Sequence, residues 1–406
     1  MNKNKIINDP IYGFVSIPDE LIFDLIQHPY FQRLRRISQM GLSYLVYPGA
    51  HHTRFHHAIG AMHLMQTAIQ VLRRKDVAIT PEEEQAALIA ILLHDIGHGP
   101  FSHALEFAIV NNTSHEEISL AVMHKLNAFF SGKLDLAIQI FRGKYYKKFL
   151  SQLISSQIDV DRLDYLRRDS FYSGVIEGQV NADRLIKMMY VVDNQLVIEE
   201  KGIYSVEKFI ISRRLMYWQV YFHKTGMMLE KILEKVLLRV RDLLQNGHAV
   251  FLDDALKYLF EQQLNTLDDK SLSVFLSIDD SDIIYHVKKW MHSEDTILSY
   301  LSTMVINRQH LNKIIIQKNA FDPEEVEEIA KQIVTDFNIP PKDIDYLLLQ
   351  GTLTNKAYDK DKDPVYLLQK NGTLIEFSQA SDQLNISALS QPVSKYFLSY
   401  PSSLKR

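Results

Sequence analysis

The sequence predicts a mainly α-helical protein, a helical bundle around one metal site, followed by a small C-terminal α+β part. Apolar residues recur at three- and four-residue intervals over most of the first 300 residues, which indicates amphipathic helices. Ten of the sixteen histidines lie between His51 and His124, and such clustering is typical of a metal centre. After about residue 310, short apolar runs bounded by Gly, Asn and Pro indicate strands.

The first 20 residues predict short extended pieces, such as Gly13–Ile17. Helical spacing begins at Asp19 and restarts after Pro29, because proline fits the first turn of a helix but not its interior. Further helices are expected at 54–75, 81–97, 114–130, 133–140, 145–157, 159–170, 181–189, 205–246 and 252–263. Within this helical part, only 196–198 is typical of a strand.

The last hundred residues have a different pattern. We expect strands at 313–317 and 346–349, a helix opened by Asp322-Pro323, and a hairpin formed by 365–368 and 373–377. The sequence therefore predicts a helical core over residues 1–305 and a small α+β region over 306–406. It indicates no chemistry for this second region, whose role in assembly or regulation is open.

Composition limits the function. At 406 residues with 46% hydrophobic and 23% charged residues, the chain is typical of globular proteins. Its net charge of −4 gives no reason to expect binding to nucleic acid or to an anionic membrane. The absence of cysteine excludes disulfides and thiolate ligands. The N-terminus is polar and no apolar run approaches the roughly 20 residues that span a bilayer, so we expect a cytoplasmic protein.

The most informative segment is an apolar run, Ala86 to Leu93, that ends in His94-Asp95. Burying an imidazole and a carboxylate without a partner is costly, and a divalent cation would supply one. His57 and Asp161, each at the start of a predicted helix, would complete a set of two imidazoles and two carboxylates. This set suits Mn, Fe, Zn, Co or Ni, and leaves positions for water and a substrate oxygen, as hydrolytic sites require.

Simpler interpretations exist for each residue. Taken singly, His57 or Asp161 would more often be a helix cap or a satisfied polar residue. The spacing of Asp159 and Asp161 also occurs in calcium loops, but the helical leucines that follow and the missing glycine argue against one. The other histidines of this region could be surface or loop residues: His51, His52, His56 and His63.

Seven segments occur in a defined order: NDPIYG (8–13), FQRLRRI (31–37), YPGA (47–50), RFHH (54–57), HDIGHGPFSH (94–103), HE (115–116) and DVDRLDY (159–165). Together they resemble the HD-domain phosphohydrolase superfamily, and more narrowly its deoxynucleoside triphosphate triphosphohydrolase branch, over about residues 8–224. The resemblance implies an all-α bundle around one metal, and its pattern matches the four ligand positions proposed above.

The resemblance also implies roles for residues around the metal. His98 and His103 would contact the α-phosphate and the attacking water, and His115, supported by Glu116, would protonate or orient the leaving oxygen. Alternatively, His103 is a buried core residue and His115 an ordinary first-turn residue.

A second set would bind the substrate. Three arginines would bind the phosphates with help from Tyr165, Tyr221 would stack on the sugar, and Asp169 and Gln39 would hold the 3′-hydroxyl. The arginines are Arg54, Arg162 and Arg213. Tyr221 could instead be one of several core aromatics, and Arg213 part of a solvated face.

We therefore expect a metal-dependent hydrolase that converts a deoxynucleoside triphosphate to deoxynucleoside and triphosphate, with Mg²⁺ possible on the substrate phosphates. The alternatives are an HD-type phosphatase or phosphodiesterase acting on a nucleoside monophosphate or signalling nucleotide, and a non-catalytic nucleotide-binding scaffold. By resemblance, Gln32 and Arg35 match an activator-nucleotide site in a homo-oligomer, a dimer or tetramer. Gln27 replaces the acidic residue that reads guanine there, which argues against guanine-specific activation.

Overall fold

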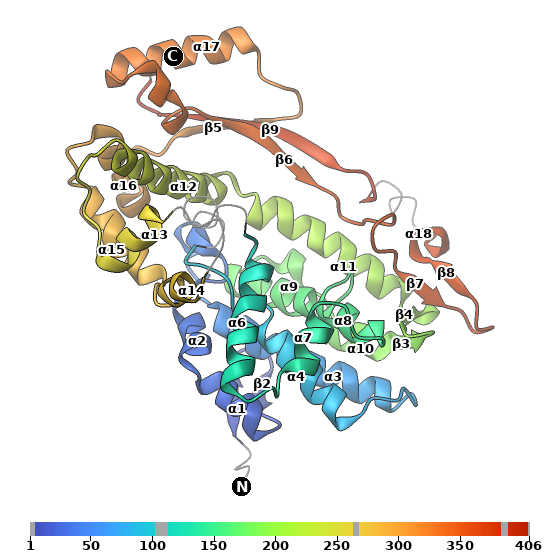
Figure 1. The fold of residues 1–406 in the computed structure, drawn as a ribbon. Coiled ribbons are helices and arrows are strands. Elements are labelled where there is room, and N and C mark those ends of the chain that lie inside the picture. The colour runs from blue at the N-terminus through green and yellow to red at the C-terminus, as the bar shows by residue number, and fades with distance from the viewer. Residues whose placement is uncertain (1–4, 102–112, 263–267, 383–388, 405–406) are drawn as a thin grey trace.

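We analysed a computed structural model that describes residues 5–101, 113–262, 268–382 and 389–404. Helices form most of it, as the sequence predicts. Figure 1 shows the helices gathered in one bundle, with a three-stranded sheet lying across α12 (Lys224–Gln245) and helix α17 (Pro323–Phe337) beyond that sheet. The described helices include none that is long and apolar enough to cross a membrane.

The N-terminal residues form an antiparallel hairpin of β1 (Ile6–Asp9) and β2 (Gly13–Ser16). Short helical segments follow: α1 (Glu20–Gln27), α2 (Pro29–Gln32), η1 (Arg33–Arg36) and η2 (Gly41–Leu45). The prediction that Pro29 restarts the helix is confirmed, since Pro29 is the first residue of α2.

The centre of the bundle is α4 (Pro81–Leu93), which packs between α3 (Arg54–Arg73) and α7 (Asp135–Phe141). A capping box of Thr80 and Glu83 starts α4, and every residue from Ala86 to Leu93 is buried. The surrounding helices are α6 (His115–Phe129), α8 (Lys148–Ile154), α9 (Val160–Ser173) and α10 (Ala182–Met188). The uniformly apolar run is thus explained by burial on all sides.

The strand expected at 196–198 is confirmed, since these residues lie in β4 (Gln195–Glu199). The expectation that it is the only strand of this part was wrong, because β4 pairs with β3 (Met189–Val192), and Asp193 and Asn194 join the two strands at φ 50° and 61°. Such positive φ angles are typical of a tight two-residue turn. The helix expected at 205–246 is interrupted: α11 (Ile203–Met216) leads into a π-helical turn, η5 (Tyr217–Tyr221), before α12. π turns often mark functional sites.

The remaining helices flank α12, and α16 packs directly on it. They are α13 (Asp254–Glu261), α14 (Asp269–Phe275), α15 (Asp280–Trp290) and α16 (Thr296–Asn307).

The C-terminal residues form parts of two sheets. One sheet has the order β5–β9–β6 and contains β5 (Lys313–Gln317), β6 (Leu349–Asn355) and β9 (Val393–Tyr400). The expected strand at 346–349 was wrong, because η6 (Pro341–Tyr346) ends at the first of these residues and β6 begins only at the last, Leu349. The expected hairpin is confirmed as β7 (Tyr366–Leu368) and β8 (Leu374–Glu376), which leads into α18 (Phe377–Ala380).

The hairpin β7–β8 is joined to the helical part by hydrogen bonds. Strand β7 pairs in parallel with β4, with Ile198 opposite Leu367, and completes a sheet of order β3–β4–β7–β8. Residues on both sides of the predicted boundary at 305 therefore share one sheet. The segment between β6 and β7 is hydrogen-bonded to Gln157, just before α9, and to Arg213 on α11, and several predicted site residues lie on these two helices.

Candidate metal and phosphate site

Predicted metal ligands from three parts of the chain meet in the bundle. One ligand atom each of His57, His94 and Asp161 lies within 4.8 Å of the other two. Asp161 Oδ1 is 3.0 Å from His57 Nε2 and 3.4 Å from His94 Nε2. The fourth predicted ligand is adjacent, since the carboxylate oxygens of Asp95 lie 3.4 Å from His94 Nε2 and 3.8 Å from His57 Nε2. These separations suit side chains that share one ion.

The ends of three helices position these residues. His57 lies in the first turn of α3, and Asp161 lies in the first turn of α9. Helix α4 ends at Leu93, so His94 is its C-cap and Asp95 lies in the turn that follows. The expectation that the helix continues to residue 97 was therefore wrong. In a continuing helix, consecutive side chains point about 100° apart around the axis. At the end of a helix, consecutive side chains can point into the same space.

The ring nitrogens of the two histidines fit a metal ion. Nε2 of His57 and Nε2 of His94 are buried and have no hydrogen-bond partner within the described ranges. Their other nitrogens are held: Nδ1 of His57 lies 2.7 Å from Asp164 Oδ2, and Nδ1 of His94 donates to the Ile91 carbonyl over 2.6 Å. A metal-binding histidine usually donates its second N–H to a carboxylate or a carbonyl in this way.

Charge interactions keep the carboxylates ionised. Burial raises the pKa of Asp95, but His94, His98 and Arg54 outweigh it and hold that pKa well below its usual value. The pKa of Asp164 falls to about 2, because Arg168 and His57 outweigh its burial. Burial lowers the pKa of His57, but Asp161 and Asp164 raise it to about 10. His57 and His94 likewise outweigh burial and lower the pKa of Asp161. Asp95 and Asp161 are thus available as ligands, and a cation at their centre would replace the protons that the histidines otherwise hold.

A second group, Asp95, His98 and His115, adjoins the first. His98 Nε2 lies 3.3 Å from Asp95 Oδ1, and the His98 ring stacks on His115 at 3.9 Å. His115 begins α6, and its Nε2 lies 3.3 Å from Glu116 Oε1. Three of the four predicted catalytic residues are thus in contact, and the fourth, His103, lies outside the described residues.

The three predicted phosphate-binding arginines differ in their partners. Arg54 Nη1 donates to Asp95 Oδ2 at 2.5 Å, and Arg162 Nε donates to Asp159 Oδ2 at 3.2 Å. Arg213 is 5% exposed and donates to Gln157 and to the Ala357 carbonyl, both neutral, with no carboxylate partner in the described part of the chain. Its pKa is lowered by burial and by Arg162. A buried cation of this kind favours an anionic ligand.

The residues predicted to hold the sugar lie near the metal cluster. The Tyr221 hydroxyl, at the end of the π turn, donates to Asp169 Oδ2 over 2.7 Å. The Tyr165 ring lies between, 6.4 Å from the ring of Tyr221 and 6.4 Å from that of His57. Gln39 Oε1 is buried without a hydrogen-bond partner in the ranges that the structure describes.

Some residues of the site were not predicted. Asp164 and Arg168 support His57, and their four-residue spacing on a predicted helix was the available signal. His52 could have been a surface or a loop residue; it lies in the loop before α3 and is only 1% exposed. Nothing in the sequence indicated that Gln157 and Ala357 would contact Arg213.

The predicted regulatory pair lies on the segment before the first ligand helix. Arg35 Nε donates to Gln32 Oε1 at 2.9 Å, and the Arg35 guanidinium lies 3.5 Å from the centre of the Phe55 ring. Arg35 is exposed. A nucleotide at this position remains a prediction.

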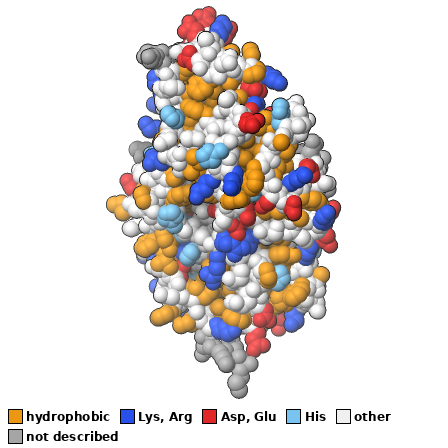
Figure 2. Space-filling model, turned by 90° about the vertical axis from the view of Figure 1, so that its left-hand side faces the viewer, with side chains coloured by type: hydrophobic (Ala, Val, Ile, Leu, Met, Phe, Trp, Pro, Cys, Tyr) orange, Lys and Arg blue, Asp and Glu red, His pale blue; other side chains and the backbone are white. Residues whose placement is uncertain are grey.

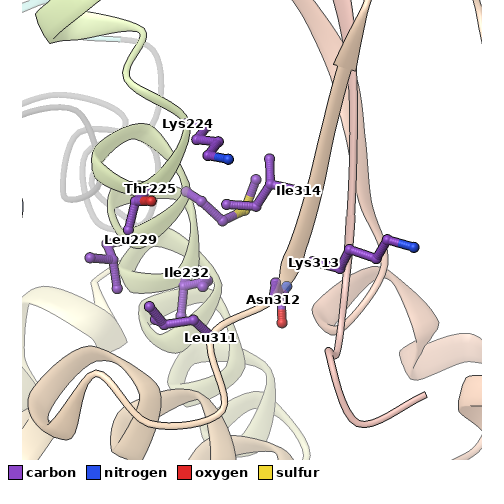
Figure 3. Close-up of a pocket in the computed structure, with 9 residues that line it drawn as sticks. Lys224, Thr225, Leu229, Ile232, Leu311, Asn312, Lys313 and Ile314 are labelled. Atoms are coloured by element: carbon purple, nitrogen blue, oxygen red, sulfur yellow. The ribbon is translucent and has the colours of Figure 1, made fainter. Parts of the chain in front are cut away.

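A separate pocket of about 350 Å³ lies between α12 and β5 (Figure 3). Its walls are mostly apolar, with Lys224 and Lys313 at its edge, and none of its lining residues is a predicted site residue. The pocket therefore contributes nothing to the metal cluster.

On the face in Figure 2, acidic, basic and hydrophobic side chains are interspersed, with basic side chains gathered near the middle.

A helical bundle in which two imidazoles and two carboxylates converge could hold a divalent metal ion, as hydrolytic metal sites do. Residues 54–169 match the family model for the HD domain, and residues 180–345 match the model for the HD associated region. The chain belongs to the HD-domain phosphohydrolases.

Three relatives illustrate the similarity. The crystal structure of a phosphohydrolase from Bacteroides thetaiotaomicron matches with a TM-score of 0.93 at 46% identity, over 98% of this chain and 99% of that one. The uncharacterized protein YwfO of Bacillus subtilis is 34% identical over 94% of this chain and 88% of its own length. A deoxynucleoside triphosphate triphosphohydrolase SAMHD1 homolog of Dictyostelium discoideum is 31% identical over 72% of this chain. This chain spans 62% of that protein.

Proposed function

We propose that this chain hydrolyses deoxynucleoside triphosphates to deoxynucleoside and triphosphate. The observation that carries the proposal is the hydrogen-bonded pair Tyr221–Asp169, which is separated from the ligand His57 by one aromatic ring, Tyr165. A flat ring and a buried acceptor beside a metal cluster suit a sugar whose phosphate lies at the metal. The name of the Dictyostelium relative supports this assignment.

The metal would be held by His57, His94, Asp95 and Asp161. When bound, a divalent ion such as Mn, Fe, Zn, Co or Ni lowers the pKa of water and polarises a phosphoryl oxygen. Mg²⁺ could accompany the substrate phosphates.

The chain's own residues would move the protons. Asp95 holds His98 Nε2, and Glu116 holds His115 Nε2, so each imidazole is oriented by a carboxylate. His98 would donate to an oxygen of the attacked phosphate. His115, stacked on it, would pass a proton to the leaving oxygen. By resemblance, His103 would assist His98.

The arginines favour a triphosphate over a single phosphate. Arg54 and Arg162 are partly neutralised by Asp95 and Asp159, whereas Arg213 has only neutral partners among the described residues. A triphosphate would supply the negative charge that this buried guanidinium lacks.

We further propose that Gln32 and Arg35 form part of an activator-nucleotide site in a homo-oligomer.

Product analysis tests the proposal. Metal-reconstituted protein is incubated with each dNTP and NTP, singly and in pairs, and nucleoside, monophosphate, pyrophosphate and triphosphate are resolved. Triphosphate from dNTPs is the expected product, and activity only in pairs would indicate the activator site. Release of monophosphate or phosphate instead would assign the chain to another type of HD phosphohydrolase. Tight binding of dATP or dGTP without any product would indicate a scaffold.

A further inference from the structure

His52 is buried against a residue of the proposed sugar site. It is 1% exposed, and its Nε2 lies 2.7 Å from Asp169 Oδ1. An ionised carboxylate can only accept, so His52 is the donor in this hydrogen bond. Its other ring nitrogen, Nδ1, has no hydrogen-bond partner in the described ranges, and Asp169 is therefore the one polar group that the ring holds there.

The His52 ring is held in place from two sides. It stacks on Tyr172 with ring centres 4.4 Å apart and planes 15° from parallel. Its backbone carbonyl accepts from the Gln39 amide at 3.0 Å, next to a β-bridge between Ser38 and Thr53. Tyr172 and Asp169 both lie on α9, so the imidazole and the carboxylate keep their relative position.

Asp169 retains acceptor capacity. Its side chain is almost wholly buried, with Oδ1 accepting from His52 and Oδ2 accepting from Tyr221. Each carboxylate oxygen has two lone pairs, so one on each oxygen remains available to a further donor. Two fixed donors set the plane of the carboxylate and therefore the direction of these free lone pairs.

We propose that His52 is a positioning residue that determines selectivity for the sugar: it orients Asp169 to accept a hydrogen bond from a hydroxyl group of the substrate. The inference rests on the proposed function, because the substrate must place its sugar beside Tyr221 and Asp169. A site arranged to accept a hydroxyl discriminates strongly against an analogue that lacks the hydroxyl, since the buried acceptor is then left without its donor.

The test compares a deoxynucleoside triphosphate with its 2′,3′-dideoxy analogue, which lacks the sugar's remaining hydroxyl. The readout is the ratio of kcat/KM for the two substrates, with KM and kcat determined separately. His52→Leu removes the donor and is expected to lower the ratio of deoxy to dideoxy kcat/KM about tenfold. The loss is expected in kcat/KM for the deoxy substrate, with the value for the dideoxy analogue unchanged. His52→Gln retains an N–H group and is expected to restore most of the ratio. His51→Leu, at the exposed neighbouring position, is the control and is expected to match the wild type.

The results distinguish the role of His52 from the proposed function. An unchanged ratio in folded His52→Leu, or an equal loss for both substrates, would overturn the role of His52 and leave the proposed function in place. A wild-type protein that hydrolyses no dNTP, alone or in pairs, would overturn the proposed function itself. If His52→Leu does not fold, Tyr172→Leu removes the ring that orients His52, at a half-buried position, and is expected to lower the same ratio.

Discussion

Asp164 Oδ2 lies 2.7 Å from Nδ1 of His57 and orients this ring from the side opposite Nε2, the proposed metal-binding nitrogen. Arg168 in turn donates to both oxygens of Asp164 at 2.9 Å, and to Asp9 of the N-terminal hairpin at 2.8 Å. All four side chains are buried. The orientation of one proposed metal ligand thus depends on the first strand of the chain.

Replacing Asp164 by Ala is expected to weaken metal binding about 10- to 100-fold, because His57 loses the carboxylate that orients it. Isothermal titration of the metal-free protein with Mn²⁺ measures the effect. Asp183→Ala, at an exposed position on α10, is the control and should bind Mn²⁺ like the wild type. Equal affinities for all three proteins would show that Asp164 does not support the site.

Arg213, the proposed phosphate-binding residue, contrasts with Arg239, which is paired with carboxylates. Arg239 is paired with Asp295 at 2.6 Å and Asp343 at 3.1 Å, so Arg239→Met is expected to cost about 3–5 kcal/mol of unfolding free energy. Arg213→Met is expected to cost less, because no described carboxylate loses a partner, but to weaken the binding of inorganic tripolyphosphate about 10- to 100-fold. Denaturant unfolding and calorimetric titration measure the two effects. Undiminished tripolyphosphate binding by Arg213→Met would contradict the assignment.

Gly97 lies where the turn after α4 touches the start of α6. A Cβ atom at this position would meet the Ser119 amide nitrogen at 2.3 Å and the His115 carbonyl oxygen at 2.5 Å. Gly97→Ala is therefore expected to displace α6 and to cost about 1–3 kcal/mol. Gly226→Ala is the matched control, since a Cβ there meets only Val46 at 3.9 Å. Thermal unfolding of both variants is the measurement, and equal stability would contradict the close approach.

Glu230 on α12 predicts a dependence of stability on pH. Burial raises its pKa to about 7 against the opposing effects of the Leu42 backbone and Lys231. The folded protein therefore holds a proton here that the unfolded chain releases above its ordinary pKa, so the contribution of Glu230 to stability is greatest at low pH. It is lost as pH rises through about 7.

Glu230→Gln removes this titration. Relative to wild type, the unfolding free energy of the variant is expected to rise by about 1–3 kcal/mol between pH 4.5 and pH 8. Chemical denaturation at the two pH values measures the difference, with Glu261→Gln at an exposed position as control. If the unfolding free energy of Glu230→Gln relative to wild type fell as the pH rose, the prediction would be contradicted.

The sequence predicts those parts of the fold that have a strong local pattern. The buried run from Ala86 to Leu93 and the hairpin 365–377 are examples. The break at Tyr217–Tyr221 was not predicted, because this aromatic-rich stretch contains neither proline nor glycine, the residues that usually mark an interruption in a helix. The pairing of β7 with β4 was also inaccessible, since it joins residues about 170 positions apart and depends on the tertiary fold.

For the site, the ordered motifs predicted residues that the structure brings together. This was possible because only a few residue types can act as metal ligands or proton donors. His57, His94 and Asp161 are such residues. Supporting residues such as His52 and Gln157 were missed, since a buried hydrogen bond from a histidine or a glutamine has no fixed spacing to its partner.

Anomalous diffraction from crystals grown with Mn²⁺ tests the central claim most directly. The account predicts one manganese peak bonded at about 2.0–2.3 Å to Nε2 of His57, Nε2 of His94 and a carboxylate oxygen of Asp161, with Asp95 completing the set. A manganese peak bonded to other residues would contradict this account. So would a structure in which these four side chains lie too far apart to share one ion while manganese fully occupies another site.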